Sequence, residues 1–367
     1  MRVKLEDVCE KGSSNLKQSD VVNLTGEYPI YGAAGYIGNV DFYHQEKPYV
    51  AIVKDGAGIG RTTLHPAKSS VIGTMQYLLP KDNVLPEYLC YVVRHMHLEK
   101  YFTGATIPHI YFRDYKNEKF NLASLDKQAE IVGILKKAES VILKRRQQLT
   151  ELDNLIKARF VEMFGDMLLN EMGWQEVHLD ALADVVSGIT KGRKVREAEL
   201  IEVPYMAVSN VKDGYIDWTT VKTIMATKQE IEQYRLLPYD VLMTEGGDPD
   251  KLGRGAVIAA PLENSIHQNH IFRVRLQLEK ILPVFFSQYL QNPKAKLYFL
   301  GCAKQTTGIA SINMKQLRSL PVLVPPIELQ EQFAAFVEQV DKSKVVVQNA
   351  LDEAQTLFDS LMQEYFG

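Results

Sequence analysis

Apolar residues recur at intervals of three and four along two long stretches of the chain, residues 125–164 and 327–366. The first stretch contains no proline and only one glycine, Gly133, and the second directly follows Pro325 and Pro326. A three-and-four spacing places apolar side chains on one face of an α-helix, and a proline pair suits a helix start. The pattern predicts two long helices, and a run of about 37 residues, such as Gln128 to Phe164, spans roughly 55 Å as a helix.

The two stretches also share one layout. A shift of 202 positions places Gln128 on Gln330 and Phe164 on Phe366. A repeat of this length predicts two copies of one unit, each a globular part followed by a long helix. A small globular part does not cover so long an apolar stripe, so the simplest partner for each helix is the other helix, in a coiled coil. The alternative is that each helix packs separately on its own globular part.

The globular parts predict mixed α and β structure. Residues 49–53 and 240–244 are β-rich runs that end in glycine-rich turns, residues 71–79 are a further strand candidate, and a helix is expected at 85–101. The fold class is therefore α+β, with two pseudo-symmetric α/β parts. The predicted boundaries are 1–123 for the first globular part, 124–165 for the central helix, 166–324 for the second globular part and 325–367 for the C-terminal helix.

Composition indicates an ordinary globular protein, because 46% of its 367 residues are hydrophobic and 24% are charged. No run of about 18 apolar residues is present, so no membrane span is expected. The first residues include acids where a signal peptide would be apolar. Cys9, Cys90 and Cys302 are widely separated, which favours a reducing compartment and argues against a zinc site. We expect a cytoplasmic protein.

Net charge gives only weak support for a nucleic-acid partner. The formal charge is −3, and segment 325–367 carries 2 cations against 8 anions, so the rest of the chain is at +3. The acidity therefore belongs to the C-terminal helix, which is a plausible surface for protein contact. Any DNA-binding face on the nearly neutral globular parts must be local.

Cations beside the glycine turns are the first candidate DNA contacts. Lys54, Arg61, Lys251 and Arg254 flank these turns, where they would contact phosphates or guanine edges. The alternative is a solvated turn with incidental charges. The basic turn that holds Lys191, Arg193 and Lys194 is favoured as a DNA-contact loop, because three cations gather within four residues. For the remaining polar candidates, turn, capping or strand-end roles are equally open. They are Thr62, His109, Gln268, Asn269, His270, Thr306, Thr307, Ser311 and Asn313.

The sequence gives little support for a catalytic or cofactor-binding site. His95 and His97 are two apart, so on a helix they point to different faces and do not make a metal pair. The acids and lysine of residues 248–251 resemble a nuclease motif, but a proline and a glycine turn argue for a loop. Residues 56–60 lack the Gly-Lys-Ser/Thr ending of a phosphate-binding loop, and no methyltransferase tetrapeptide of the Asn/Asp-Pro-Pro-aromatic type is present. We expect no catalytic residue, no metal and no cofactor in this chain.

Over its whole length the chain resembles the DNA-specificity subunit of type I restriction–modification systems. The resemblance is carried by the glycine turns at 55–61 and 245–254, by the Thr-Gly-Ile-x-Ser-Ile-Asn stretch at 307–313, and by the Pro-Pro-x-x-x-Gln start of a long helix at 325–330. The first copy departs from this pattern, with Ala123-Ser124 in place of the proline pair and Pro108-His109-Ile110 in place of Ala-Ser-Ile.

The resemblance implies that each globular part is a target-recognition domain that reads one half of a bipartite double-stranded DNA target. It implies that the helices form an antiparallel pair that sets the spacer length. Such a subunit has no catalytic activity. It docks two methyltransferase subunits that bring S-adenosylmethionine, and restriction subunits that use ATP and Mg²⁺ can join. The alternatives are a structural coiled-coil adaptor without DNA specificity and a stand-alone DNA-modifying enzyme.

Overall fold

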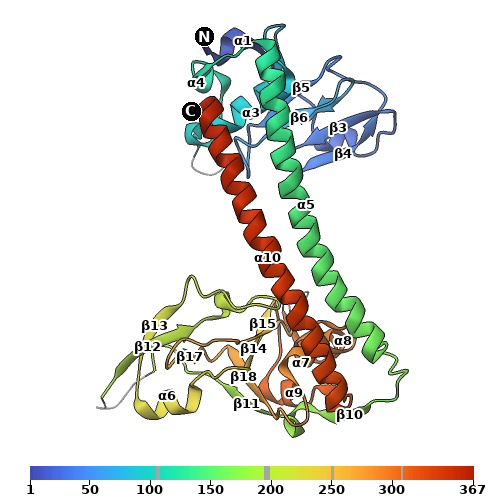
Figure 1. The fold of residues 1–367 in the computed structure, drawn as a ribbon, viewed down its shortest axis with the longest axis vertical. Coiled ribbons are helices and arrows are strands. Elements are labelled where there is room, and N and C mark those ends of the chain that lie inside the picture. The colour runs from blue at the N-terminus through green and yellow to red at the C-terminus, as the bar shows by residue number, and fades with distance from the viewer. Residues whose placement is uncertain (105–107, 194–198, 249–251, 307–308) are drawn as a thin grey trace. The chain divides into compact units, whose positions relative to one another are not determined.

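The chain divides into two compact units, each of which contains part of both long helices (Figure 1). The computed structural model describes residues 1–104, 108–193, 199–248, 252–306 and 309–367, without the side chains of residues 305, 306 and 309. Unit 1 comprises Met1–Gln148 and Val347–Gly367, and unit 2 comprises Leu149–Val346. This division cuts across both helices, and the four segment boundaries drawn from the sequence stay a prediction.

Unit 1 is built on a four-stranded antiparallel sheet of order β2-β8-β5-β6. A three-stranded sheet, β4-β3-β7, and a pair, β1-β9, complete it. The strands are β1 (Arg2–Lys4), β2 (Cys9–Ser13), β3 (Tyr28–Gly32), β4 (Gly35–Val40), β5 (Tyr49–Val53), β6 (Thr62–His65), β7 (Ser70–Val71), β8 (Met75–Pro80) and β9 (Lys119–Asn121). The helices are α1 (Leu5–Val8), α2 (Gln18–Val21), α3 (Pro86–His95), the 3-10 helix η1 (Leu98–Tyr101), α4 (Phe112–Tyr115) and the start of α5 (Leu125–Phe164).

Unit 2 has a four-stranded antiparallel sheet of order β11-β18-β14-β16, with smaller sheets β13-β12-β17, β15-β20-β19 and β10-β21. The strands are β10 (Gln175–His178), β11 (Ala183–Ser187), β12 (Ile201–Met206), β13 (Lys222–Ala226), β14 (Val241–Thr244), β15 (Gly246–Gly247), β16 (Gly255–Val257), β17 (Ile266–His267), β18 (Ile271–Leu276), β19 (Lys304–Thr306), β20 (Ile309–Ser311) and β21 (Pro321–Val324). The helices are η2 (Leu179–Ala181), η3 (Val208–Asn210), α6 (Lys228–Tyr234), α7 (Pro283–Gln291), α8 (Pro293–Cys302), α9 (Met314–Arg318) and the start of α10 (Ile327–Phe366).

The two units share one topology, which confirms the repeat expected from the sequence. Both four-stranded sheets have the same strand order and are antiparallel throughout. In both three-stranded sheets the central strand has one antiparallel and one parallel neighbour. In unit 1, β3 pairs with β4 antiparallel and with β7 parallel. In unit 2, β12 pairs with β13 antiparallel and with β17 parallel. The sheet β15-β20-β19 corresponds in unit 1 to two single bridges, from His109 to Asp55 and to Thr103.

The two long helices pack against each other within each unit, as the sequence predicted. In unit 1, Ile131 and Leu135 near the start of α5 share a core with Met362 and Phe366 at the end of α10. In unit 2 the order is reversed, because the end of α5 meets the start of α10. The ring centroids of Phe160 and Phe333 are 5.5 Å apart there. The helices are therefore antiparallel.

Aromatic side chains join these helix ends to the globular parts. In unit 2, Phe285 of α7 lies 4.9 Å from the ring of Phe164, and both are fully buried. In unit 1, Tyr88 of α3 lies 5.3 Å from the ring of Phe366, edge to face. Burial of an aromatic side chain removes a large apolar area from water, so each helix is stabilised by its unit as well as by the other helix.

A buried glutamine repeats at the start of each long helix. Gln128 and Gln330 are both fully buried. Their Oε1 atoms accept from the backbone N–H groups of Leu85, at 2.8 Å, and Leu282, at 2.9 Å. Their Nε2 groups donate to two backbone carbonyls each. One side chain thus ties the start of a long helix to the start of the short helix before it, α3 or α7.

Two local predictions are wrong. The strand expected at 71–79 is two strands, β7 and β8, because Met75 N–H donates to Ile72 O and closes a turn between them. The helix expected at 85–101 ends at His95, because His97 has a φ of 51° and leaves the right-handed helical region. A 3-10 helix follows the break.

Substitution of Gln330 by leucine tests the glutamine contact. The variant leaves the Leu282 N–H and two carbonyls without their partner in the interior, which costs about 1–3 kcal/mol of unfolding free energy. Urea unfolding followed by far-UV circular dichroism measures the loss. Gln332→Leu, at an exposed position of the same helix, is the matched control and should leave the midpoint unchanged. Equal midpoints for the two variants would contradict the assigned role.

Candidate nucleic-acid interface

The glycine turns occupy equivalent positions in the two units. Val53 N–H donates to Arg61 O at 3.0 Å, and Thr244 N–H donates to Arg254 O at 3.1 Å. The glycine before each arginine has a positive φ, 80° at Gly60 and 74° at residue 253. A Cβ there would lie 2.7 Å from a backbone nitrogen in unit 1 and 2.3 Å from a ring carbon of Phe299 in unit 2, so glycine is required in both turns.

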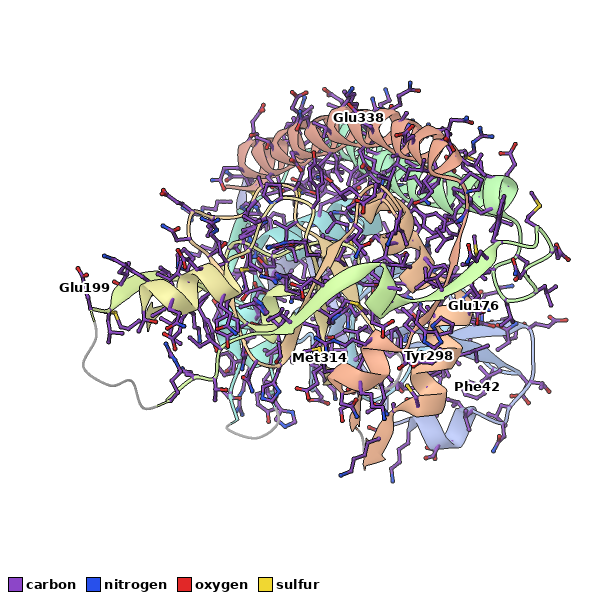
Figure 2. All side chains as sticks on the ribbon, turned by 90° about the horizontal axis from the view of Figure 1, so that it is seen from below. Phe42, Glu176, Glu199, Tyr298, Met314 and Glu338 are labelled. Carbon is purple, nitrogen blue, oxygen red and sulfur yellow. The ribbon has the colours of Figure 1, made fainter. Side chains whose placement is uncertain are left out.

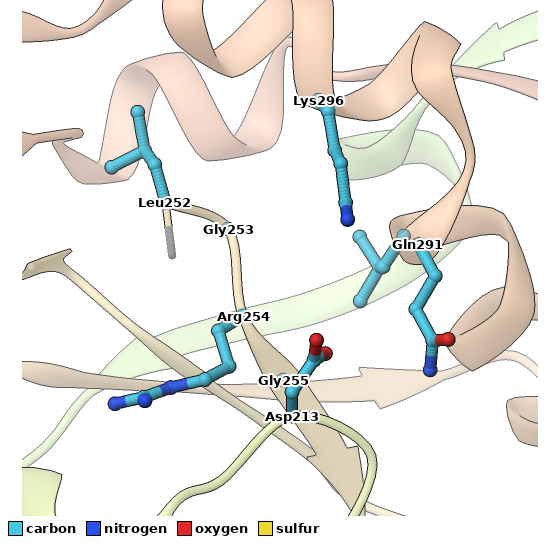
Figure 3. A pocket seen from close by; sticks show the side chains of 8 residues that line it. Asp213, Leu252, Gly253, Arg254, Gly255, Gln291 and Lys296 are labelled. Atoms are coloured by element: carbon cyan, nitrogen blue, oxygen red, sulfur yellow. The ribbon is translucent and has the colours of Figure 1, made fainter. Parts of the chain in front are cut away.

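The two arginines differ in exposure. Arg61 is exposed, and its Nη2 donates to Ala33 O at 2.7 Å. Arg254 is half-buried, and its buried Nε has no hydrogen-bond partner among the described residues. Figure 3 shows Arg254 beside Asp213 and Lys296 in a pocket with about 10 Å³ of open volume, enough for about one water molecule. The pocket is therefore a packing gap and not a ligand site.

Beside the turn of unit 1, aromatic and charged side chains form a stack on the surface. His109 Nδ1 lies 2.6 Å from Asp55 Oδ1, and Lys54 Nζ lies 3.8 Å from the other carboxylate oxygen. The ring of Tyr111 is stacked on His109 at 6.4 Å, with 25° between the planes. The guanidinium of Arg113 lies 4.8 Å over Tyr111. Exposed rings stacked with cations suit contacts with bases and phosphates.

Sequence reasoning missed Tyr111 and Arg113 as candidates. Both are exposed, and the side chain of Arg113 is 77% accessible. His109 and Tyr111 are two apart on an extended segment and therefore lie on one face, whereas Arg113 lies in helix α4, where no local spacing indicated it. The stack itself depends on Asp55, which belongs to a segment more than 50 positions earlier in the chain.

Two residues predicted to contact DNA, Thr62 and Arg193, make side-chain hydrogen bonds within the protein. Thr62 is 4% exposed, and its hydroxyl donates to Gly60 O at 3.0 Å. Arg193 makes two hydrogen bonds to the Glu230 carboxylate, at 2.5 and 2.6 Å. These bonds lower the pKa of Glu230 to about 2. Arg193 thereby connects its loop to the N-terminus of α6, where Glu230 also accepts from Thr227 N–H.

Other predicted contact residues have different surroundings. Lys191 is exposed, with no partner among the residues that the structure describes. Asn313 caps α9 by accepting from Gln316 N–H at 2.9 Å. Ser311 of β20 pairs with Gly246 of β15. Lys194, Lys251 and Thr307 lie outside the described residues, as does the side chain of Thr306.

Polar residues also gather at the end of β14 in unit 2. Gln268 and Asn269 are half-buried, and Gln268 Oε1 accepts from Val208 N–H at 3.4 Å. Asn269 lies next to the exposed His270, whose Nδ1 contacts Glu245 Oε2 at 2.5 Å. The structure thus brings Asn269, His270 and Glu245 together at the strand end, beside the predicted Ser311 segment.

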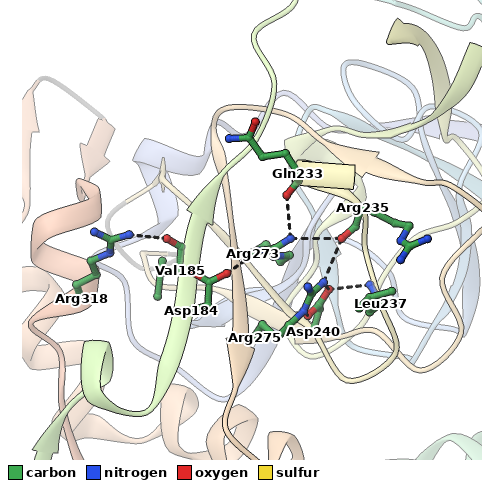
Figure 4. Close-up of polar contacts among 9 residues, drawn as sticks. All are labelled: Asp184, Val185, Gln233, Arg235, Leu237, Asp240, Arg273, Arg275 and Arg318. Atoms are coloured by element: carbon green, nitrogen blue, oxygen red, sulfur yellow. Dashed lines mark hydrogen bonds and ion pairs between the residues drawn. The ribbon is translucent and has the colours of Figure 1, made fainter. Parts of the chain in front are cut away.

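A cluster of arginines in unit 2 is structural (Figure 4). Arg273 is 3% exposed, contacts Asp184 at 2.7 Å and donates to Gln233 O at 3.1 Å. Arg275 makes two hydrogen bonds to the buried Asp240. These contacts join strand β18 to strand β11, to helix α6 and to the segment after that helix. The positive charge is thus compensated inside the fold and is not available to a DNA phosphate.

The part of the chain that the structure describes contains no group of three or more His, Cys, Asp or Glu side chains able to hold a metal ion. Its cysteines carry no paired arrangement, because Cys9, Cys90 and Cys302 are all free. Within the same described ranges, every helix is too short or too polar to cross a bilayer. The surfaces that stand out are the two strand ends with their glycine turns.

A tandem α+β repeat with paired antiparallel helices, and with exposed polar groups at equivalent strand ends, has the architecture of a two-site binding protein. The model of the type I restriction modification DNA specificity domain matches residues 1–154 and 171–354. The chain belongs to this family.

Relatives in the family include specificity subunits of type I restriction enzymes. The putative MjaX subunit of Methanocaldococcus jannaschii is 26% identical over 187 residues, which are 50% of this chain and 44% of the relative. The EcoKI subunit of Escherichia coli K12 is 26% identical over 169 residues, 44% of this chain and 36% of the relative. The chain thus spans less than half the length of these two proteins. The MjaVIII subunit of M. jannaschii is 24% identical over 323 residues, 80% of this chain and 72% of the relative.

Solved structures show the same fold. A type I restriction–modification S subunit from M. genitalium superposes with a TM-score of 0.60 at 14% identity, covering 100% of this chain and 96% of that one. A chain from a study of complex assembly and conformational transition in the type I system gives a TM-score of 0.56 at 16% identity, covering 100% and 97%. Both comparisons confirm the predicted α+β class.

The Arg193–Glu230 contact predicts a pH dependence of stability. Because the folded-state pKa of Glu230 is lowered from 4.5 to about 2, the stabilisation is complete above pH 4.5 and is lost as the pH falls toward 2. Arg193→Met should lower the unfolding free energy by about 1–3 kcal/mol at pH 7. The difference from the wild type should shrink below pH 4.5.

Urea unfolding at several pH values between 3 and 7 measures this difference. Lys191→Met, two positions away and exposed, controls for the loss of a positive charge. A constant difference across the whole pH range would show that Arg193 acts through packing and not through the Glu230 charge.

Proposed function

We propose that this chain is the DNA sequence-recognition subunit of a type I restriction–modification complex. Each unit reads one half of a bipartite double-stranded target, and catalysis is supplied by other subunits in the cytoplasm. S-adenosylmethionine is bound by the methyltransferase subunits, and ATP with Mg²⁺ by restriction subunits where these are present. The proposal rests on membership of the specificity-domain family together with the tandem repeat.

One observation carries the proposal: the backbone topology repeats while the aromatic, cationic and amide side chains beside the strand end differ. Unit 1 presents His109, Tyr111 and Arg113 at the strand end where unit 2 presents Asn269 and His270. Base edges in the major groove are distinguished by the donors and acceptors that face them. Two scaffolds of one topology with different surface groups suit two different half-sites, and an asymmetric bipartite target follows.

The long helices offer surfaces for the two methyltransferase subunits. Apolar side chains of both long helices are exposed, among them Leu143 and Val346 at 68% each. The acidic residues of α10 point outward as well. Figure 2 shows Glu338 on the outer side of this helix, where it pairs with Lys342 at 2.7 Å. Apolar and acidic groups together suit a protein partner better than DNA.

Two other functions are distinguishable from this one. A structural coiled-coil adaptor would need the helices but no DNA preference in the globular parts. A stand-alone enzyme would transfer methyl groups without a partner. Incubation of the purified chain with S-adenosylmethionine and DNA tests the second possibility, and methyl transfer by the chain alone would overturn the proposal.

The decisive experiment is methylome sequencing in a host that lacks its own type I system. The chain is co-expressed with the methyltransferase encoded beside it. We expect one new methylated motif with two short half-sites and a fixed gap. Replacement of residues 1–123 by the corresponding segment of a relative should change one half only. Soluble partner proteins without any new motif would favour the adaptor.

Arg61 provides a test at a single residue. Arg61→Gln should weaken binding of the assembled complex to its target by about 1–3 kcal/mol, because the variant loses an exposed cation at the glycine turn. Fluorescence anisotropy with the methylome-derived duplex measures the affinity. Lys11→Gln, an exposed cation of β2 outside the turn, is the control. Equal affinities for Arg61→Gln and the wild type would exclude this contact.

A further inference from the structure

The equivalent strands β5 and β14 are each followed by an imidazole–carboxylate pair, in which a histidine ring contacts an aspartate or a glutamate. Lys54 and Glu245 are equivalent, because their carbonyls accept from Ile110 N–H at 3.0 Å and Ile312 N–H at 2.9 Å. Lys54 N–H donates to Thr74 O, and Glu245 N–H donates to His270 O, both at 3.0 Å. In unit 1 the carboxylate of the pair belongs to Asp55, the residue after Lys54, and contacts His109. In unit 2 it belongs to Glu245 itself and contacts His270.

The two pairs have similar geometry although different segments supply their residues. The Nδ1 atom of His109 lies 2.6 Å from Asp55 Oδ1, and that of His270 lies 2.5 Å from Glu245 Oε2. His109 follows the equivalent of β19, whereas His270 precedes β18. The same chemical pair thus follows the equivalent strand in both units, although the two carboxylates occupy successive positions and the imidazoles come from different segments.

In both pairs the carboxylate is the more covered partner. The side chains of Asp55 and Glu245 are 31% and 33% exposed, and those of His109 and His270 are 38% and 58% exposed. A carboxylate at Nδ1 keeps the proton on that nitrogen and fixes the orientation of the ring. The Nε2 atom is then an acceptor on the more exposed side of the pair.

The neighbours of each imidazole suit a nucleic-acid contact. The ring of His109 is stacked on Tyr111, which in turn lies under the Arg113 guanidinium. The Nε2 atom of His270 lies 3.4 Å from the side-chain amide nitrogen of Asn269. Each imidazole therefore has aromatic, cationic or amide groups beside it, and these groups bind phosphates and base edges.

We infer that His109 and His270 are equivalent specificity-determining residues, one for each half-site, and that Asp55 and Glu245 position them. Nε2 accepts a hydrogen bond from an exocyclic amino group of adenine or cytosine, since these are the donors in the major groove. At His270 this bond replaces the 3.4 Å contact with the Asn269 amide nitrogen. The carboxylates do not touch DNA. This inference rests on the proposed function and adds the residues that read each half.

Methylome sequencing of variants in the complete complex tests the inference. His109→Phe keeps a flat ring but removes Nε2, and Asp55→Ala removes the positioning carboxylate. Both should relax one base position of one half-site, with the preference there falling about tenfold. His270→Phe and Glu245→Ala should relax one position of the other half. The spacing and the untouched half should stay as in the wild type.

Conservative variants of the two carboxylates test whether these groups orient the histidine rings or only stabilise the fold. Asp55→Asn and Glu245→Gln keep an oxygen that accepts from Nδ1, so their motifs should match the wild type. His97→Phe is the matched control, because His97 also contacts a carboxylate, Glu99 at 3.3 Å, but on a 3-10 turn away from the strand end. It should leave the motif unchanged.

Three outcomes would overturn the inference while leaving the proposed function intact. They are an unchanged motif in both histidine variants, relaxation of the same half by both, and uniform loss of methylation by variant complexes that still assemble. If a phenylalanine variant does not assemble, the milder alanine variant of its carboxylate partner gives the same readout. A wild-type complex that produces no motif would instead contradict the proposed function.

Discussion

The structure depends on the burial of both ends of the two long helices. Met362 and Phe366 complete the core of unit 1, and Phe333, near the start of the same helix, is fully buried in unit 2. The other long helix likewise supplies Leu135 to unit 1 and Phe164 to unit 2. Neither unit has a complete apolar core without both helices. The antiparallel pairing is therefore a condition for folding.

Within that constraint, the two units keep their backbone connections and differ in what they expose. The buried glutamines Gln128 and Gln330 make the same hydrogen bonds in both, and the four-stranded sheets share one order. Interior polar groups must be satisfied wherever the fold is reused, which constrains those positions. Surface groups carry no such requirement, so the side chains around the two imidazole–carboxylate pairs are free to differ between units.

Sequence periodicity was most informative where one physical rule dominated. The helices run from Leu125 to Phe164 and from Ile327 to Phe366, as the apolar spacing predicted. Prediction from the sequence was less accurate where contacts between distant residues determine the local structure. The backbone break at His97 ended a helix that local preference would continue. Among the candidate contacts, Arg193 is held by Glu230 and Thr62 is buried, and neither partner nor burial can be read from neighbouring residues.

The sequence alone determined the tandem repeat, the long helices, the α+β class and the family resemblance, because these follow from regular spacing and from motifs read along the chain. Only the tertiary structure decided which polar residues meet. The contacts of His109 with Asp55 and of His270 with Glu245 join positions 54 and 25 apart in the sequence. Side chains that far apart are brought within hydrogen-bonding distance by strand pairing and core packing, and local sequence does not encode those distances.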